Sequence, residues 1–357
     1  MKISKYLDSD NRQQMNKEVL TEDVLRFAEH FELREQLRSK SFLITGATGL
    51  IGSVLIRCLL SLNEKYGLGI RISAVVRSLD KAKTIFDDDY YKIRFFPFQL
   101  SDITQEHIEQ TVDYVIHLAS PTASKYFVEH PVETLSTAID GTQYVLQYAC
   151  ETRVESMVFA SSLEVYGSNH NDDLICEDFQ GYLNPMGVRS SYNMGKRAAE
   201  CLCHAYAEEY KVPVKIARLT QTTGAGIAED DNRVIVQFTR LAASGQDIIL
   251  HTTGEAARPY LYTTDAISAM LYILLKGQPG EAYNVANEET YISARGMAEY
   301  LRDTYAPAIS VRMEIADNWG YSPITKLRLS TEKLQSLGWK PQYGLNEIFD
   351  RLIKYLS

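Results

Sequence analysis

Residues 41–62 read SFLITGATGLIGSVLIRCLLSL, which is an apolar run, a glycine-rich turn and a second apolar run in succession. The initial SFLIT is typical of a short buried strand, whereas residues 53–62 have the apolar spacing of a helix. Gly46, Gly49 and Gly52 lie between them as GxxGxxG. Glycines permit a tight turn and close approach of the backbone to a pyrophosphate, which the free N–H groups of a helix N-terminus attract. The stretch therefore predicts a strand, a phosphate-binding loop and a helix.

Strand-like and helix-like segments continue to alternate after this unit. Helices are expected at residues 134–148 and 191–210, and apolar strands at residues 70–76, 93–98, 114–118, 156–161 and 214–219. This alternation predicts an α/β protein with a doubly wound parallel sheet that helices cover on both faces. After about residue 222 the alternation becomes irregular, which predicts a smaller, split substrate-binding part.

Residues 1–40 are rich in charge and carry Val24, Phe27 and Phe31 at helical spacing. We expect them to form an N-terminal extension that packs on the outside of the molecule. They contain no apolar core of a signal peptide, so secretion is not indicated.

The composition excludes several classes of protein. The 357 residues include 37 Lys and Arg against 46 Asp and Glu, which gives a net charge of -9, and 45% are hydrophobic. Such a chain is globular, and its acidic balance argues against a nucleic-acid partner. No apolar stretch approaches the roughly 18–20 residues that span a bilayer, so no membrane partner is expected. The five cysteines show no CxxC spacing, so we expect reduced thiols packed as small hydrophobes in a cytoplasmic protein.

The residue that follows the second strand bears on the choice of cofactor. A carboxylate there would hold the ribose 2′-hydroxyl of NAD, whereas an arginine suits the 2′-phosphate of NADP. Arg77 stands at this point, so the sequence favours NADP slightly over NAD. In the alternative, Arg77 stacks on the adenine or faces solvent, and NAD binds. Asp102 follows the third strand, where a carboxylate could meet the adenine amino group.

Tyr192 and Lys196 form YxxxK on the predicted helix 191–210, so both lie on one helical face. A phenol with an ordinary pKa near 10 needs a shift of roughly 2–3 units to act as a base near neutral pH. The ammonium of Lys196 and an oxidised nicotinamide could supply that shift by attraction. Ser162, at the end of the fifth strand, could hydrogen-bond the same substrate oxygen.

These motifs resemble the extended short-chain dehydrogenase/reductase family of NAD(P)-dependent nucleotide-sugar epimerases and dehydratases, over about residues 41–350. The resemblance rests on TGATGLIG (45–52), HLASP (117–121), SSLEVYG (161–167), SYNMGK (191–196) and ARPYLYTTDA (257–266). It implies a homodimer, and it divides the chain after the N-terminal helical extension (1–40) into two domains. These are a Rossmann domain, formed by 41–222 with a return segment near 259–286, and a substrate-binding domain, formed by 223–258 and 287–357.

The resemblance also implies roles for individual residues. Ser162, Tyr192 and Lys196 would form the catalytic triad for oxidation at C4 of a nucleotide-linked hexose. Arg258 would grip the substrate's pyrophosphate, with Arg233 as a weaker candidate. Tyr192 and Lys196 would also contact the cofactor, together with Gly46, Thr48, Gly49, Leu50, Ile51, Gly52, Asp102, Ile103, Leu118, Ala119 and Ser120. His117 ends an apolar strand, and we expect it to be a packed, hydrogen-bonded core residue.

Within the family, the chain is most similar to UDP-glucuronate decarboxylases, and Glu164 stands where decarboxylases and dehydratases carry an active-site glutamate. Several positions depart from the family's patterns. Leu163 replaces the aspartate of dehydratases, Ala138 replaces an asparagine, and Gln221 replaces a substrate-contacting asparagine. The arginine that decarboxylases use near the carboxylate has no clean match. Lys326 is nearest in register, and Arg328 lies beside it.

These departures leave the outcome of the reaction open. We favour epimerisation, in which the hydride returns to the same sugar. Decarboxylation of UDP-glucuronate is the second hypothesis, because Glu164 supports it and the missing arginine does not. The third is an NADPH-dependent 4-keto-sugar reductase, supported by Arg77 alone. A hypothesis from another class is a cofactor-sensing binding protein without chemistry, which the intact Ser162, Tyr192 and Lys196 set disfavours.

Overall fold

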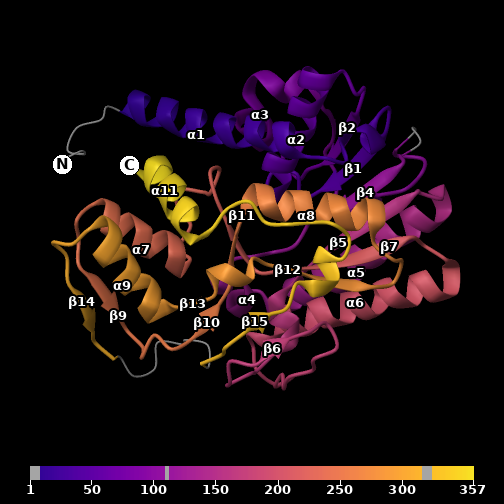
Figure 1. The fold of residues 1–357 in the computed structure, drawn as a ribbon. Helices are drawn as coiled ribbons and strands as arrows, with labels where there is room; N and C mark the ends of the chain where they lie inside the picture. The colour runs from indigo at the N-terminus through magenta and orange to yellow at the C-terminus, as the bar shows by residue number, and fades with distance from the viewer. Residues whose placement is uncertain (1–8, 109–111, 316–323) are drawn as a thin grey trace.

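A seven-stranded parallel sheet forms the centre of the computed structural model, which describes residues 9–108, 112–315 and 324–357 (Figure 1). The strand order is β12-β7-β5-β4-β1-β2-β3. The α/β class expected from the sequence is therefore confirmed. The strands are β1 (Ser41–Thr45), β2 (Arg71–Val75), β3 (Arg94–Phe96), β4 (Tyr114–His117), β5 (Ser156–Ser162), β7 (Val214–Leu219) and β12 (Ala282–Val285).

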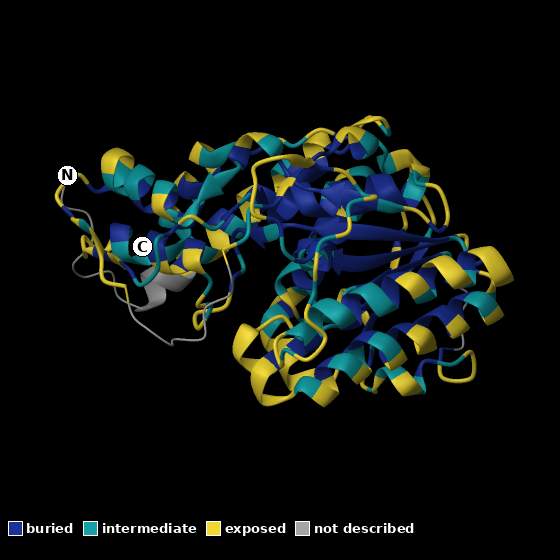
Figure 2. Ribbon diagram, turned by 90° about the horizontal axis from the view of Figure 1, so that it is seen from below, coloured by how far each residue is buried: buried dark blue, intermediate teal, exposed yellow. Residues whose placement is uncertain are grey.

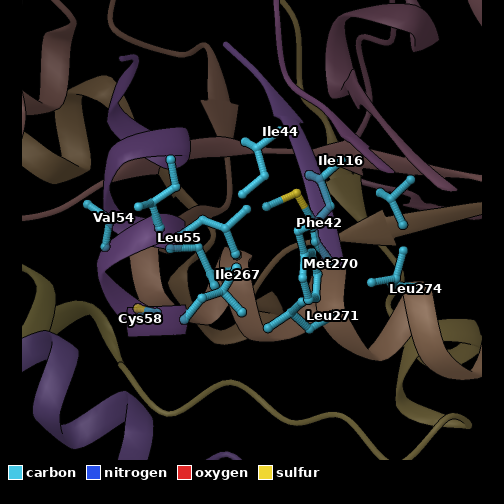
Figure 3. Packing of buried hydrophobic residues seen from close by; sticks show 14 of the residues in the cluster. Phe42, Ile44, Val54, Leu55, Cys58, Ile116, Ile267, Met270, Leu271 and Leu274 are labelled. Carbon is cyan, nitrogen blue, oxygen red and sulfur yellow. The ribbon is translucent and has the colours of Figure 1, made fainter. Parts of the chain in front are cut away.

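Apolar residues alternate between the two faces of this sheet, and helices cover both. On β1, Phe42 and Ile44 pack towards one face, and Leu43 packs towards the other. Figure 3 shows the first face, where Phe42, Ile44 and Ile116 meet side chains of α2 and α8. The strands are buried between the helical layers (Figure 2). The covering helices are α2 (Leu50–Tyr66), α3 (Leu79–Phe86) and α8 (Thr263–Lys276) on one face, and α5 (Pro131–Thr152) and α6 (Ser190–Tyr210) on the other. The short helix α4 (Ser124–Glu129) packs against α5.

The part of the chain after residue 220 contributes a separate apolar cluster beside the sheet. Residues of α7, α9 and α11 meet there around Phe238, Leu301 and Phe349. The elements of this region are β8 (Gln221–Thr223), α7 (Val234–Ala243), β9 (Ile248–Leu250), β10 (Ala257–Arg258), β11 (Tyr260–Tyr262), β13 (Ile292–Ser293), α9 (Ala294–Tyr305), β14 (Val311–Met313) and α11 (Leu345–Leu356). Three further elements are β6 (Leu174–Ile175), β15 (Arg328–Leu329) and α10 (Glu332–Gln335).

The N-terminal helix α1 (Ser9–His30) packs against α2 and α8 of the central unit and against α11 (Figure 1). It lies outside the sheet layers, as expected, but Val24, Phe27 and Phe31 belong to the main apolar core. Asp23 on the same helix is buried against Tyr262 and Arg351. The extension therefore joins the central unit to the C-terminal helix.

The cysteines are all free thiols, and only part of the expectation for them holds. Cys58 and Cys203 are buried, as predicted for small hydrophobes, whereas Cys176 and Cys201 are exposed. Cys201 and Cys203 lie two apart on α6, so they point in different directions. Among the described residues, no helix combines the length and the apolar character needed to cross a membrane.

Candidate active site

The glycine-rich loop lies where the order of the sheet reverses, between β1 and β4. Gly46 has φ +68°, and a Cβ on it would lie 2.7 Å from the carbonyl carbon of Leu118 and 2.8 Å from the nitrogen of Ala119. Thr45 Oγ1 accepts hydrogen bonds from the N–H groups of Leu118 and Ala119, which holds the two strand ends together. Only glycine fits this position, and the crevice beside it is where open α/β sheets bind ligands.

The N-terminus of α2 follows this loop. A Cβ on Gly52 would overlap the carbonyl oxygen of Gly46, so the helix packs directly on the turn. Gly49 caps the helix without a side-chain hydrogen bond, and the first turn contains no acidic residue. Its N–H groups and positive dipole end therefore remain for an anion. Thr48, Leu50 and Ile51 lie on this turn, partly exposed, and the cradle fits the pyrophosphate of a dinucleotide.

The residues predicted to face the adenosine half lie at the ends of β2 and β3. Arg77 is exposed, and the described residues offer its side chain no hydrogen bond or ion pair. Asp102 ends the short turn η3 (Leu100–Asp102) and accepts hydrogen bonds from the Gln99 N–H and the Ser101 hydroxyl. Ile103 after it is buried. Ser120, beyond β4, is half-buried, and its hydroxyl donates to the carbonyl of Pro121.

The three residues predicted for catalysis come together at the end of β5. Ser162 ends that strand, and its hydroxyl oxygen accepts the N–H of Glu164 at 3.2 Å. It lies close enough to Tyr192 on α6 to lower the pKa of that phenol. Lys196 lies one helical turn further and is buried. Its Nζ donates to the carbonyl oxygen of Ala160 at 2.7 Å and lies 4.7 Å from the ring centroid of Phe159. The structure thus gathers a hydroxyl, a phenol and an ammonium from two neighbouring elements.

The electrostatics of this group differ from the expectation for Lys196. Burial raises the pKa of Tyr192 to about 12, although the nearby hydroxyl of Ser162 lowers that pKa, and the charge of Glu164 raises it further. Burial lowers the pKa of Lys196 to about 8, against the attraction of Glu200. Burial is thus the largest influence on the pKa of both groups.

Two small residues bring the catalytic helix close to its neighbour. A Cβ on Gly195 would lie 2.9 Å from the Cβ of Ala138, which is buried on α5. The alanine at the family's asparagine position therefore lets α5 and α6 approach next to Lys196. His117 is packed in the core and hydrogen-bonded, as predicted, since its Nδ1 lies 2.7 Å from Thr45 Oγ1. Burial lowers its pKa to about 3.

Glu164 lies on the turn η4 (Leu163–Tyr166) directly after Ser162. Its Oε2 accepts a hydrogen bond from Asn193 Nδ2 at 3.3 Å, and its Oε1 lies 3.8 Å from Nη1 of Arg258. The structure thus joins two predicted residues, Glu164 and Arg258, that lie far apart in the sequence. It does not bring Arg233 to them, because Arg233 is held by both carboxylate oxygens of Asp231. Gln221 is half-buried at the start of β8.

A buried network of charged and polar side chains anchors the catalytic helix α6 to the sheet. Glu200 on α6 forms an ion pair of 2.7 Å with Arg218 on β7 and accepts the hydroxyl of Ser161. Arg218 also donates to Tyr166 Oη. The network ties α6 to β5 and β7, so the position of Tyr192 depends on these buried charges.

Residues 42–286 match the NAD dependent epimerase/dehydratase family. The chain belongs to this family. It is 29% identical over 308 residues to UDP-glucuronic acid decarboxylase 5 of Arabidopsis thaliana, which covers 85% of this chain and 86% of that relative. It is also 29% identical over 336 residues to dTDP-D-glucose 4,6-dehydratase of Bos taurus, covering 89% and 88%. The similarity supports an enzyme of the extended short-chain dehydrogenase/reductase type.

Solved structures share the fold of this epimerase/dehydratase family member. UDP-glucose 4-epimerase of Thermotoga maritima superposes with a TM-score of 0.75 at 21% identity, over 88% of this chain and 98% of that one. UDP-glucuronic acid 4-epimerase of Bacillus cereus, solved with NAD, gives 0.71 at 20%, over 88% and 98%. The matched family region begins after α1 and η1 (Arg34–Leu37), which precede it in this chain.

Several features of the site were not predicted from the sequence of this family member. Leu163, at the dehydratase aspartate position, is buried in a small apolar cluster and does not take part in the site. Lys326 forms an ion pair of 2.8 Å with Asp172. Phe127 contacts Tyr192 but belongs to no motif that was singled out, and Asn193, which contacts Glu164, lies within SYNMGK but was given no role. Asn193 could have been noticed, because it directly follows Tyr192 in YxxxK.

Proposed function

We propose that the chain is a nucleotide-sugar 4-epimerase that oxidises C4 of an NDP-hexose and then reduces the ketone from its other face. The observation that carries the proposal is the juxtaposition of Ser162 at the end of β5 with Tyr192 on α6, where Lys196 lies one helical turn further. This group follows β5, which neighbours β4 and, beyond it, the glycine loop after β1. A phenol, a hydroxyl and an ammonium beside a dinucleotide cradle suit proton removal from a sugar hydroxyl.

The residues divide this chemistry among them. Ser162 holds the oxygen of the C4 hydroxyl, and Tyr192 takes the proton of that hydroxyl as the carbonyl forms. A nicotinamide cofactor held by the glycine loop would supply the hydride acceptor for C4 and the donor for its return. Tyr192 returns the proton to the oxygen when the hydroxyl re-forms, so protons and electrons balance over the cycle. Lys196 keeps a positive charge beneath the phenol and would hold the nicotinamide ribose.

The surroundings of this group favour epimerisation over the alternatives. Dehydration needs an acid next to Ser162, where the buried Leu163 stands. Of the two cations nearest the decarboxylase arginine in register, Lys326 is engaged by Asp172, and only the exposed Arg328 is left to bind a hexuronate carboxylate. Decarboxylation of a UDP-hexuronate remains the second candidate, because Glu164 lies beside the catalytic group and the plant relatives named above are UDP-glucuronic acid decarboxylases.

Arg77 supports a preference for NADP within this function, because its exposed guanidinium lies at the end of β2. Under this proposal the Arg77→Ala variant binds NADP more weakly and NAD unchanged. Fluorescence titration of the two reduced cofactors measures both affinities. Equal affinities of the unsubstituted enzyme for the two cofactors would contradict the preference.

The reaction is tested by incubating the full chain and cofactor with UDP-, CDP-, GDP- and dTDP-sugars and analysing the products by mass spectrometry and chromatography. Epimerisation leaves the mass unchanged and produces a second chromatographic peak. Loss of carbon dioxide supports decarboxylation, loss of water supports dehydration, and gain of two hydrogens supports a reductase. Recovery of every sugar unchanged, with cofactor bound, would favour the cofactor-sensing binding protein.

A further inference from the structure

The guanidinium of Arg258 has few partners for a group that is largely buried. Its side chain is 21% exposed, and an arginine carries five N–H donors. Within the described residues it forms one ion pair, at 3.8 Å from Glu164, and no hydrogen bond. By contrast, Arg233 is bound by both oxygens of Asp231 and by the carbonyl of Thr222. Arg258 is therefore the arginine of this region that retains donors for an incoming anion.

Glu164 is held from two sides, and the two contacts differ in kind. Asn193, next to Tyr192, donates to Oε2 at 3.3 Å, whereas Arg258 on β10 reaches Oε1 at the longer distance of 3.8 Å. The glutamate side chain is 37% exposed, so its ion pair is partly screened by water. A diphosphate offers several charged oxygens that an arginine can bind in bidentate fashion, and it would outcompete this one carboxylate oxygen.

We propose that Arg258 is exchanged between two anions: it holds Glu164 when the site contains no substrate, and it passes to the diphosphate of the nucleotide sugar on binding. The inference rests on the proposed function and adds to it a coupling between diphosphate binding and the release of Glu164. Once Arg258 has moved, Glu164 keeps its hydrogen bond from Asn193 and turns a free oxygen towards the catalytic group. Occupancy of the diphosphate subsite thereby releases the Glu164 carboxylate beside Tyr192, whereas a sugar without a diphosphate leaves Glu164 paired with Arg258.

The exchange predicts that breaking the ion pair strengthens substrate binding, because Glu164 competes with the diphosphate for Arg258. Glu164→Gln removes the competing charge, so the variant binds a nucleoside diphosphate more tightly, by roughly three- to fivefold for a pair this exposed. Arg258→Gln binds it at least about tenfold more weakly, since charge-assisted hydrogen bonds are lost. In the Arg258→Gln background, adding Glu164→Gln brings no further gain. Binding of the uncharged nucleoside changes in none of these variants.

Isothermal titration of the full chain, with cofactor present, measures these affinities. UDP, CDP, GDP and dTDP are tested on the unsubstituted enzyme, and the tightest binder and its nucleoside are taken to the variants. Glu299→Gln breaks the exposed ion pair between Arg295 and Glu299 and serves as the matched control with unchanged affinity. Unchanged cofactor affinity shows that each variant is folded.

Two results would overturn the exchange, and they are distinguishable. If the enzyme binds one of the four diphosphates but Glu164→Gln binds it no more tightly, the exchange is wrong and the proposed function stands. If none of the four binds to the unsubstituted enzyme, the proposed function fails and the exchange fails with it. Should Arg258→Gln not fold, the gain in Glu164→Gln alone decides the matter.

Discussion

The ring of Phe127 is stacked on the ring of Tyr192, with centroids 4.3 Å apart and planes inclined by 10°. Phe127 lies on α4, and its carbonyl oxygen accepts the hydroxyl of Ser191 at 3.3 Å. The short helix α4 is thus attached to the first turn of α6, where it covers one face of the phenol. This contact shields one face of the phenol, which stays partly exposed, and burial is the largest cause of its raised pKa.

We expect Phe127→Leu to lower the turnover number by about ten- to hundredfold, because the phenol loses the surface that orients it. Greater access of water also lowers the pKa of Tyr192, so activity that depends on the phenolate rises at a lower pH than in the unsubstituted enzyme. The pH profile of kcat/KM measures this shift. Val128→Ala, at the exposed neighbouring position, is the control with an unchanged profile. A lower rate at an unshifted profile would indicate a purely structural role for Phe127.

Tyr192→Phe removes the proton acceptor while the ring keeps its stacking on Phe127. We expect the turnover number to fall by about 10²–10⁴-fold, which is the usual contribution of a positioned acid or base. The affinity for the cofactor should stay within a factor of about two, since the cradle at Gly46 is untouched. Product formation by chromatography and cofactor titration measure the two quantities. Unchanged turnover would end the assignment of Tyr192.

The contact between Asp23 and Arg351 predicts that α1 is needed for stability. Asp23 is 1% exposed, accepts the hydroxyl of Tyr262 and forms an ion pair with Arg351 on α11. Asp23→Ala leaves the buried hydroxyl of Tyr262 without its acceptor and leaves Arg351 with Glu22 alone, so it should lower the free energy of unfolding by about 1–3 kcal/mol. Glu29→Ala on the same helix, whose pair with Lys65 is exposed, should cost less than about 1 kcal/mol. Urea unfolding compares the two, and equal losses would contradict a special role for Asp23.

Asp265 predicts a pH dependence of stability. Burial raises its pKa to about 7, although the N–H groups of Gln342 and Tyr343 donate to its carboxylate. A carboxyl whose pKa is raised by folding stabilises fully below its ordinary pKa of about 4, and this contribution is lost as the pH rises to about 7. Asn does not titrate, so the stability of the unsubstituted enzyme relative to Asp265→Asn should fall between about pH 5 and 7 and then level off. Thermal unfolding of both proteins across this range measures the difference, and a constant difference would show that the pKa of Asp265 is not raised.

Much of the architecture follows from spacing within short segments. The strand, turn and helix of residues 41–62, and the placing of Tyr192 and Lys196 on one helical face, depend on neighbours a few positions away. These features could be predicted because local periodicity determines which side chains share a face. The end of β5 could likewise be placed, and with it Ser162.

Which acidic residue each arginine contacts depends on segments that lie far apart in the sequence. Arg258 and Arg233 resemble each other in the sequence as candidates for the same anion, yet Arg233 is bound by Asp231, whereas Arg258 faces Glu164. The burial that raises the pKa of Tyr192, through Phe127 on a separate helix, is equally absent from any local pattern. Ion pairing and burial depend on which surfaces pack together, and packing is a property of the whole chain rather than of a segment.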